Sequence, residues 1–298
     1  MSLREAGLWS AIWVGVTLAF AGALWVWLDG SAGRETATTR TLEFLTGYLI
    51  EKSLAVDNVF VWLMLFSFFG IPLELQKRVL TYGVLGALVL RTLMILGGAW
   101  LIVQFHWLLY VFGAFLLLTG VKMLWLADAR PDLAANPVLR WIRRHVPVTE
   151  ALHGERFIVT LPGTNGPVRA LTPLALALVM VELSDVIFAV DSVPAIFAIT
   201  TDPFIVYTSN IFAILGLRAL YFALAAMIHR FKYLKYALAL VLVFIGSKIF
   251  LVGIIGKIPA VISLSVTFGL IAGGVLVSLW KTRGDKPAMR EKLLGIWN

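Results

Sequence analysis

The sequence predicts an all-α polytopic membrane protein with about eight transmembrane helices. Of its 298 residues, 60% are hydrophobic and only 14% are charged, whereas soluble domains carry roughly 25% charged residues. The mean hydropathy is +0.91, and apolar runs of about 20 residues, the length of a bilayer-spanning helix, recur along the chain. This composition excludes a disordered chain, a nucleic-acid-binding domain and most soluble enzymes, despite a pI near 9.8.

Each predicted span is an apolar run bounded by charged residues, proline or glycine. The first run continues through residues 25–28, beyond the point where a signal peptide would be cleaved, so we expect it to remain as a helix. The eight runs cover residues 8–28, 43–69, 78–104, 107–126, 171–200, 204–229, 232–256 and 259–281.

The loops between these runs alternate in charge. Lys and Arg gather near residues 77–78, 130–169 and 230–235 and again after residue 281, whereas the intervening loops carry few. Loops rich in Lys and Arg stay on the cytoplasmic side of a membrane. We therefore expect both termini in the cytoplasm.

The basic loop 128–170 contains two short elements. Residues 137–146 combine an apolar stripe with Arg140, Arg143 and Arg144, which fits either a helix on the anionic inner leaflet or an ordinary solvated loop. Residues 157–171, with an Asn-Gly pair at 165–166, predict a β-hairpin.

Two stretches of the chain resemble each other. Glu51 and Asp57, six residues apart, recur as Asp185 and Asp191 at the start of the second stretch. The later matches are Leu90-Arg91 with Leu217-Arg218, Tyr110 with Tyr236, Gly120 with Gly246, and Lys122 with Lys248. Each stretch holds three spans, an odd number, so the second enters the membrane from the opposite side. Inverted repeats of this kind are typical of transporters.

The repeats divide the chain into five parts. They are 1–41, the first helix and an external loop; 42–127, the first three-helix repeat; 128–170, the basic cytoplasmic loop; 171–256, the second repeat; and 257–298, the last helix and a basic cytoplasmic tail.

Five carboxylates lie inside the predicted spans: Glu51, Asp57, Glu182, Asp185 and Asp191. A central Asp costs about 2.5–3.5 kcal/mol on insertion, so these groups need compensation. One alternative is a neutral ion-pair network with Lys52, Arg91, Lys122, Arg218 and Lys248. The other is a shared cation site at the interface of the repeats.

Helix geometry places Glu51 nearly in line with Asn58, seven residues on, and about 120° from Asp57. Glu182 and Asp185 are neighbours, whereas Asp191 lies roughly opposite Glu182 on a straight helix. We expect Pro194 to kink this helix beside Asp191 and to free a carbonyl oxygen for a ligand.

The available ligands favour a hard cation. The carboxylates can be joined by side-chain oxygens of Asn58, Asn210, Ser184 and Ser192, a set suited to Mn²⁺, Ca²⁺ or Mg²⁺. The chain has no cysteine and only four histidines, all in loops or at span ends, which argues against the usual zinc and copper sites. Without cysteine, a redox role would need a borrowed cofactor, and we expect no organic cofactor.

Two acid-bearing stretches make the sequence recognisable. Residues 44–60, FLTGYLIEKSLAVDNVF, and 181–195, VELSDVIFAVDSVPA, strongly resemble the TerC family of bacterial integral membrane proteins, and within it the Alx branch. Residues 82–87 and 201–206 fit the same branch. The resemblance covers nearly the whole chain, from about residue 8 to residue 281.

The resemblance implies export of Mn²⁺ across the bacterial inner membrane, with links to alkaline pH in the Alx branch and to tellurite resistance in the family name. The residues it carries over as the metal site are Glu51, Asp57, Asn58, Glu182, Ser184, Asp185 and Asp191. Family members usually begin with one more hydrophobic helix, and residues 2–6 resemble the segment before their second helix. The sequence is thus either an eight-span version or one whose start lies upstream.

The leading hypothesis is a Mn²⁺ exporter, not an enzyme, in which Asp57 and Asp191 exchange the metal for protons. The main alternative is a non-transporting membrane component of an envelope or tellurite stress response that docks a protein partner through loop 128–170. An intramembrane enzyme or quinone-linked redox protein is the least favoured.

Overall fold

Ten helices and one hairpin are found in the part of the chain that the computed structural model describes, residues 3–125, 136–163, 166–225, 233–256 and 258–282. The elements are α1 Leu3–Ala32, α2 Arg34–Phe68, α3 Leu73–Gln104, α4 Leu108–Trp125, α5 Pro137–His145, β1 Ile158–Gly163, β2 Gly166–Leu171, α6 Pro173–Phe197, α7 Pro203–Leu215, α8 Leu217–Ala225, α9 Leu234–Ile255 and α10 Ala260–Lys281. The chain is therefore predominantly helical, as the sequence predicts.

Six of the described helices, α1, α3, α4, α6, α9 and α10, are long and apolar enough to cross a membrane. Helices α7 and α8 meet at a bend of 43° and together would make a seventh span. The remaining predicted run lies in the 35-residue α2, which is long enough but carries Glu51, Lys52 and Asp57 near its middle. All eight predicted runs are thus largely helical, and length and apolarity alone identify six or seven spans.

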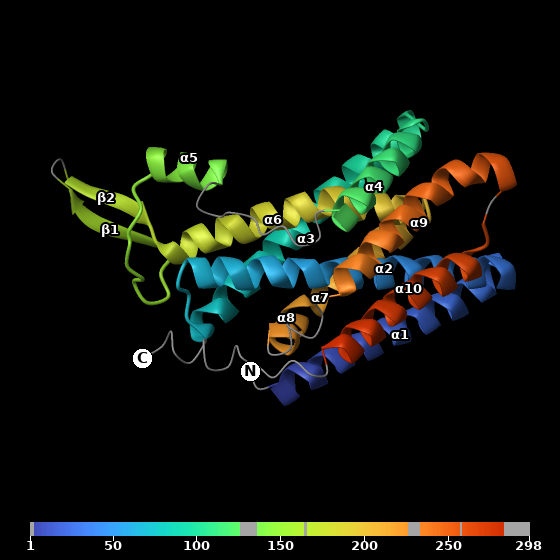
Figure 1. Ribbon diagram of the computed structural model, residues 1–298, viewed down its shortest axis with the longest axis horizontal. Helices are drawn as coiled ribbons and strands as arrows, with labels where there is room; N and C mark the ends of the chain where they lie inside the picture. The colour runs from blue at the N-terminus through green and yellow to red at the C-terminus, as the bar shows by residue number, and fades with distance from the viewer. Residues whose placement is uncertain (1–2, 126–135, 164–165, 226–232, 257, 283–298) are drawn as a thin grey trace.

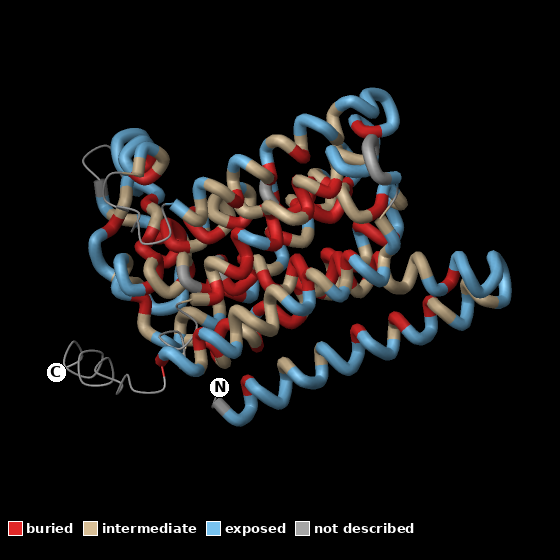
Figure 2. Tube along the Cα trace, turned by 45° about the vertical axis from the view of Figure 1, so that its right-hand side comes forward, coloured by how far each residue is buried: buried red, intermediate tan, exposed pale blue. Residues whose placement is uncertain are grey.

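The long helices run side by side along the longest axis of the molecule (Figure 1). The hairpin and α5 lie at one end of the molecule, and the first turn of α1 and the last turn of α10 are the ends of those helices nearer to it (Figure 1). Buried residues concentrate where the inner helices meet, whereas α1 is exposed along most of its length (Figure 2).

The outer face of α3 is apolar. Its exposed large side chains recur every three or four residues, at Leu85, Val89, Leu93, Leu96 and Trp100. A stripe with helical periodicity that faces outward rather than into the core is expected where lipid surrounds a helix. The exposed surface of α3 is therefore suited to a bilayer.

Helices α4 and α9 pack closely through glycines at equivalent positions. A Cβ on Gly120 of α4 would lie 2.8 Å from the carbonyl oxygen of Ala239 on α9. A Cβ on Gly246 of α9 would lie 2.8 Å from the carbonyl oxygen of Gly113 on α4. The helices run antiparallel at this crossing, and the absence of side chains lets their backbones touch.

Loop 128–170 contains the helix and the hairpin that the sequence allowed. The Asn136 side chain caps α5 by accepting from the backbone N–H groups of Val138 and Leu139, as is usual for a residue before a helix. Leu139 and Ile142 are buried in the main apolar cluster of the protein. The sequence left open whether this segment is a helix on the inner leaflet or a solvated loop, and in the structure it is a helix whose apolar stripe packs on the body of the protein.

The hairpin pairs β1 with β2 in antiparallel register, from Ile158 with Leu171 to Gly163 with Gly166. The turn residues 164–165, including Asn165 of the predicted turn, lie outside the described residues. Thr172 follows β2 and caps α6 by accepting from the N–H of Ala175. The hairpin therefore leads directly into the helix that carries Asp185.

Tyr221 of α8 supports a prediction about stability. It is fully buried, and its hydroxyl donates a hydrogen bond of 2.7 Å to the Gln76 side chain of α3. We expect Tyr221→Phe to lower the free energy of unfolding by about 1 kcal/mol, because the substitution leaves a half-buried acceptor on Gln76 unpaired. Thermal unfolding in detergent measures the change, with the exposed Tyr110→Phe as the control. Equal stability of both variants would contradict the assigned hydrogen bond.

Candidate cation site

A small internal cavity lies where helices of both predicted repeats meet. Its volume is about 40 Å³, enough for a cation or a few water molecules. It is lined by Glu51, Leu54, Ala55 and Asn58 of α2, Arg91 of α3, Met123 of α4, Phe188 and Ser192 of α6, and Leu242 of α9.

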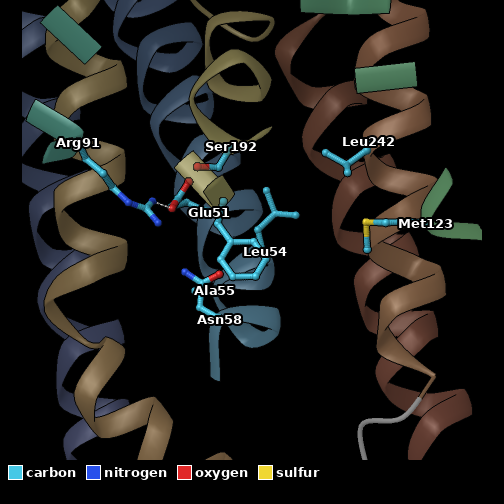
Figure 3. Close-up of a pocket in the computed structure, with 9 residues that line it drawn as sticks. Glu51, Leu54, Ala55, Asn58, Arg91, Met123, Ser192 and Leu242 are labelled. Atoms are coloured by element: carbon cyan, nitrogen blue, oxygen red, sulfur yellow. Dashed lines mark ion pairs between the residues drawn. The ribbon is translucent and has the colours of Figure 1, made fainter. Parts of the chain in front are cut away.

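Arg91 joins the two repeats at this cavity. Its Nε lies 3.0 Å from Asp185 Oδ2 and its Nη2 lies 2.7 Å from Asp185 Oδ1, a bidentate pair. Its Nη1 pairs with Glu51 Oε1 on the other side (Figure 3). The side chain of Arg91 is only 1% exposed and those of both acids only 2%. The planar guanidinium suits this arrangement, because it can bind two carboxylates at once while remaining charged.

Helical spacing explains why these groups converge. Glu51 and Asn58 are seven residues apart on α2, and so are Asp185 and Ser192 on α6, which places each pair on one helix face. The predicted alignment of Glu51 with Asn58 is confirmed, since both line the cavity. Asn58 Nδ2 also lies 3.4 Å from Asp185 Oδ1, so α2 and α6 meet directly at the site.

Three oxygen atoms of cavity-lining residues have no hydrogen-bond donor in the described part of the chain. They are Glu51 Oε2, Asn58 Oδ1 and Ser192 Oγ. Buried oxygen atoms are nearly always paired, because an unpaired one loses its interaction with water. Carboxylate, amide and hydroxyl oxygens are the ligands that hard divalent cations prefer. The cavity therefore offers the chemistry of a cation site.

The other predicted ligands are placed differently. The carboxylate of Glu182 lies against Gly86 of α3 rather than in the cavity, and the Ser184 hydroxyl donates to the Met180 carbonyl oxygen 2.7 Å away. Asn210 is buried in α7 and does not line the cavity.

Two of the five predicted acids cannot be placed at the site. Asp57 lies on α2 and Asp191 on α6, but their side chains fall outside the described residues. Among the side chains that are described, no group of three acids or histidines converges as a metal site. The described part of the site is therefore a pair of acids bridged by an arginine.

Of the basic residues in the predicted charge network, Arg91 binds the two described acids of the site. Lys52 Nζ donates to the Ala213 carbonyl oxygen 3.1 Å away, and Arg218 Nη1 donates to the Thr81 hydroxyl 3.2 Å away. Lys122 is exposed and Lys248 is buried, both on helices beside the cavity. The described ion pairs of Glu51 and Asp185 are both made by Arg91.

Helix α6 continues as one helix through Pro194 to Phe197, and the kink expected beside Asp191 stays a prediction. One feature of the site was not evident from the sequence. The cavity wall includes the apolar Leu54, Met123, Phe188 and Leu242, which no sequence motif marks.

Comparison with known proteins identifies the family. The family model described as "Integral membrane protein TerC family" matches residues 36–286. The chain belongs to the TerC family. It is 57% identical over 280 residues to the "Putative membrane-bound redox modulator Alx" of Salmonella typhi, covering 94% of this chain and 85% of that protein.

Two more relatives agree with this assignment. The Escherichia coli K12 protein of the same name is 56% identical over 287 residues, 96% of this chain and 88% of that protein. An uncharacterized membrane protein of Myxococcus xanthus is 45% identical over 283 residues, 95% of this chain and 85% of that protein. The predicted resemblance to TerC proteins and to Alx is confirmed. No solved structure matches the chain significantly.

Proposed function

We propose that this TerC family protein exports a divalent cation, Mn²⁺, across the bacterial inner membrane. The observation that carries the proposal is the buried pair of Glu51 and Asp185, brought together from two helices beside oxygen atoms that lack donors. Ionisable groups inside a membrane protein generally mark an ion pathway, because their burial is otherwise costly. Oxygen ligands without thiolate or imidazole favour Mn²⁺, Ca²⁺ or Mg²⁺ over softer metals, and the resemblance to Mn²⁺-handling proteins selects Mn²⁺.

Eight spans arranged as two inverted repeats are part of this proposal. The α4–α9 crossing supports it, because Gly120 and Gly246 are equivalent in the two repeats and make equivalent backbone contacts. Glu51 and Asp185 are equivalent too, and both bind Arg91. Antiparallel contact between equivalent residues is expected around a two-fold axis in the membrane plane, where such folds place their substrate. Cytoplasmic termini fit the arrangement in Figure 1, where α1 starts and α10 ends on the side nearer to α5 and the hairpin.

Flux into proteoliposomes tests the proposed activity. We expect purified protein to move Mn²⁺ down an imposed gradient at a rate well above that of empty vesicles. Ca²⁺ and Mg²⁺, added in turn, should compete more weakly than unlabelled Mn²⁺. Vesicles that contain folded protein and yet show only the background leak would refute transport.

Proton coupling through Asp57 and Asp191 is a further prediction. Both acids lie on the two helices that carry the site, and a buried carboxylate that loses its metal is more stable when protonated. An alkaline cytoplasmic side should therefore speed efflux, because the protons exchanged for the metal are released there, and Asp57→Asn or Asp191→Asn should remove this dependence on the pH gradient. Fluorescent detection of internal pH during Mn²⁺ flux measures the exchange. Efflux that ignores the gradient in the wild type would exclude coupling.

A non-transporting role in stress response is the second candidate. It is favoured by the exposed basic surface of α5, where Arg143, Arg144 and Trp141 face outward, and by the name of the relatives, which suggests redox modulation. Since the chain has no cysteine, such a role would depend on a partner or an external cofactor. Replacing Arg143 and Arg144 with Gln separates the candidates, because transport should persist while a docking function should not.

A further inference from the structure

Arg91 forms ion pairs with the two acids that the proposed transported cation would need as ligands. It uses both carboxylate oxygens of Asp185 and one of Glu51. Resting on the proposed function, we propose that Arg91 is an internal cation that competes with the transported ion for Glu51 and Asp185. In the structure described, the guanidinium is bound to both acids. When the transported ion is bound, the ion takes the place of the guanidinium.

The oxygen count supports replacement rather than simultaneous binding. With Arg91 in place, an entering ion meets three donor-free oxygens, Glu51 Oε2, Asn58 Oδ1 and Ser192 Oγ. Withdrawal of Arg91 adds the three carboxylate oxygens that it now binds. Six oxygens match the octahedral coordination that Mn²⁺ and Mg²⁺ favour. The cavity of about 40 Å³ lies beside the bound guanidinium, so an ion that enters it reaches all six oxygens only after Arg91 withdraws.

Electrostatics also makes the two cations exclusive. The three charged groups are 1–2% exposed, so water screens the repulsion between an arginine and a divalent ion only weakly. The bare acid pair would be strongly disfavoured in this apolar setting, because two buried carboxylates need a counter-charge. Arg91 supplies that charge whenever the ion is absent. It thus opposes loading and promotes release.

Glu182 offers Arg91 another partner when the ion is bound. It lies on α6 one turn before Asp185, with its carboxylate against Gly86 on the same helix as Arg91. Its Oε2 is buried and accepts no hydrogen bond from the described residues. A shift of the guanidinium toward Glu182 would keep the arginine paired while it vacates the cavity.

The equivalent arginine of the second repeat provides a matched control. Arg218 is exposed and donates to Thr81 rather than to an acid of the site. The two arginines share the same Leu-Arg-x-Leu context, at residues 90–93 and 217–220, but only Arg91 enters the cavity. Removing the charge of Arg218 should therefore leave ion binding unchanged.

The test compares Mn²⁺ binding and transport by wild type, Arg91→Gln and Arg218→Gln. Competition predicts that Arg91→Gln binds Mn²⁺ about tenfold or more tightly, because the ion no longer displaces a resident cation. In flux assays, the Mn²⁺ concentration that gives half the maximal rate should fall. The maximal rate should fall too, because no guanidinium returns to displace Mn²⁺ from the acids. A purely structural arginine would give weaker binding and slower flux. Unchanged or weaker binding by folded Arg91→Gln would overturn the proposal.

Folding is followed by thermal unfolding with and without Mn²⁺. Without metal, we expect Arg91→Gln to unfold at a lower temperature than wild type. Addition of Mn²⁺ should raise its unfolding temperature by more than that of wild type. If this variant does not fold, Arg91→Lys provides the test, because it keeps the charge but loses the bidentate grip. It should bind Mn²⁺ several-fold more tightly than wild type, and weaker binding would overturn the proposal. A wild type that binds no Mn²⁺ would instead refute the proposed function itself, and this inference with it.

Discussion

Asp185→Asn is expected to lower the Mn²⁺ transport rate by roughly 100-fold, equivalent to about 2.7 kcal/mol. The substitution removes one of the two buried charges proposed to bind the ion and leaves Arg91 with Glu51 alone. Glu51→Gln should have a similar effect, because Glu51 contributes the other charge from α2. Flux of Mn²⁺ into proteoliposomes measures both variants.

Stability must be measured beside transport, since breaking a buried ion pair can cost 3–5 kcal/mol. Asp185→Glu keeps the charge and should restore part of the transport rate. Glu155→Gln removes an exposed partner of Arg78 and should leave transport unchanged. Wild-type transport rates in folded Asp185→Asn or Glu51→Gln would show that the acid pair is not the ion site.

Gly246→Leu is expected to destabilise the protein by about 3 kcal/mol or to prevent its accumulation in the membrane. The new side chain would have to displace the backbone of α4 at Gly113, and overpacking of a tight contact costs about 1–3 kcal/mol or more. Gly120→Leu should be equally damaging, because Gly120 makes the equivalent contact with Ala239. Expression level and thermal unfolding in detergent measure both effects.

Gly269→Leu is the matched control for these variants. Gly269 lies on the transmembrane helix α10, exposed and with open space around its Cβ position, so a leucine there should be tolerated. Equal stability of all three variants would mean that the α4–α9 crossing is looser than described.

Much of the fold could be predicted because the determining signals are local. Long apolar runs predict helices wherever they occur. A pair of acids six residues apart, beginning at Glu51 and again at Asp185, identifies the helices that carry the acids. The hairpin 158–171 was likewise predictable from its turn residues. The limits of the elements follow from caps such as Asn136 and Thr172.

The contacts of the site depended on tertiary structure. Arg91 and Arg218 occupy matching positions in the two repeats, yet one binds two acids and the other binds Thr81. Sequence spacing cannot distinguish them, because the difference lies in which helix packs opposite each arginine. The stripe of α5 shows the same limit, since an apolar stripe beside arginines fits lipid as well as protein until its partner surface is known.

Equilibrium Mn²⁺ binding by the purified chain tests the central claim most directly. Electron paramagnetic resonance of the free ion, recorded as protein is titrated, reports how much Mn²⁺ is bound. The account predicts saturable binding by the wild type that is lost in the folded double variant Glu51→Gln/Asp185→Asn. Binding of equal strength by the double variant would place the ion elsewhere and contradict the assignment of this cavity as the site.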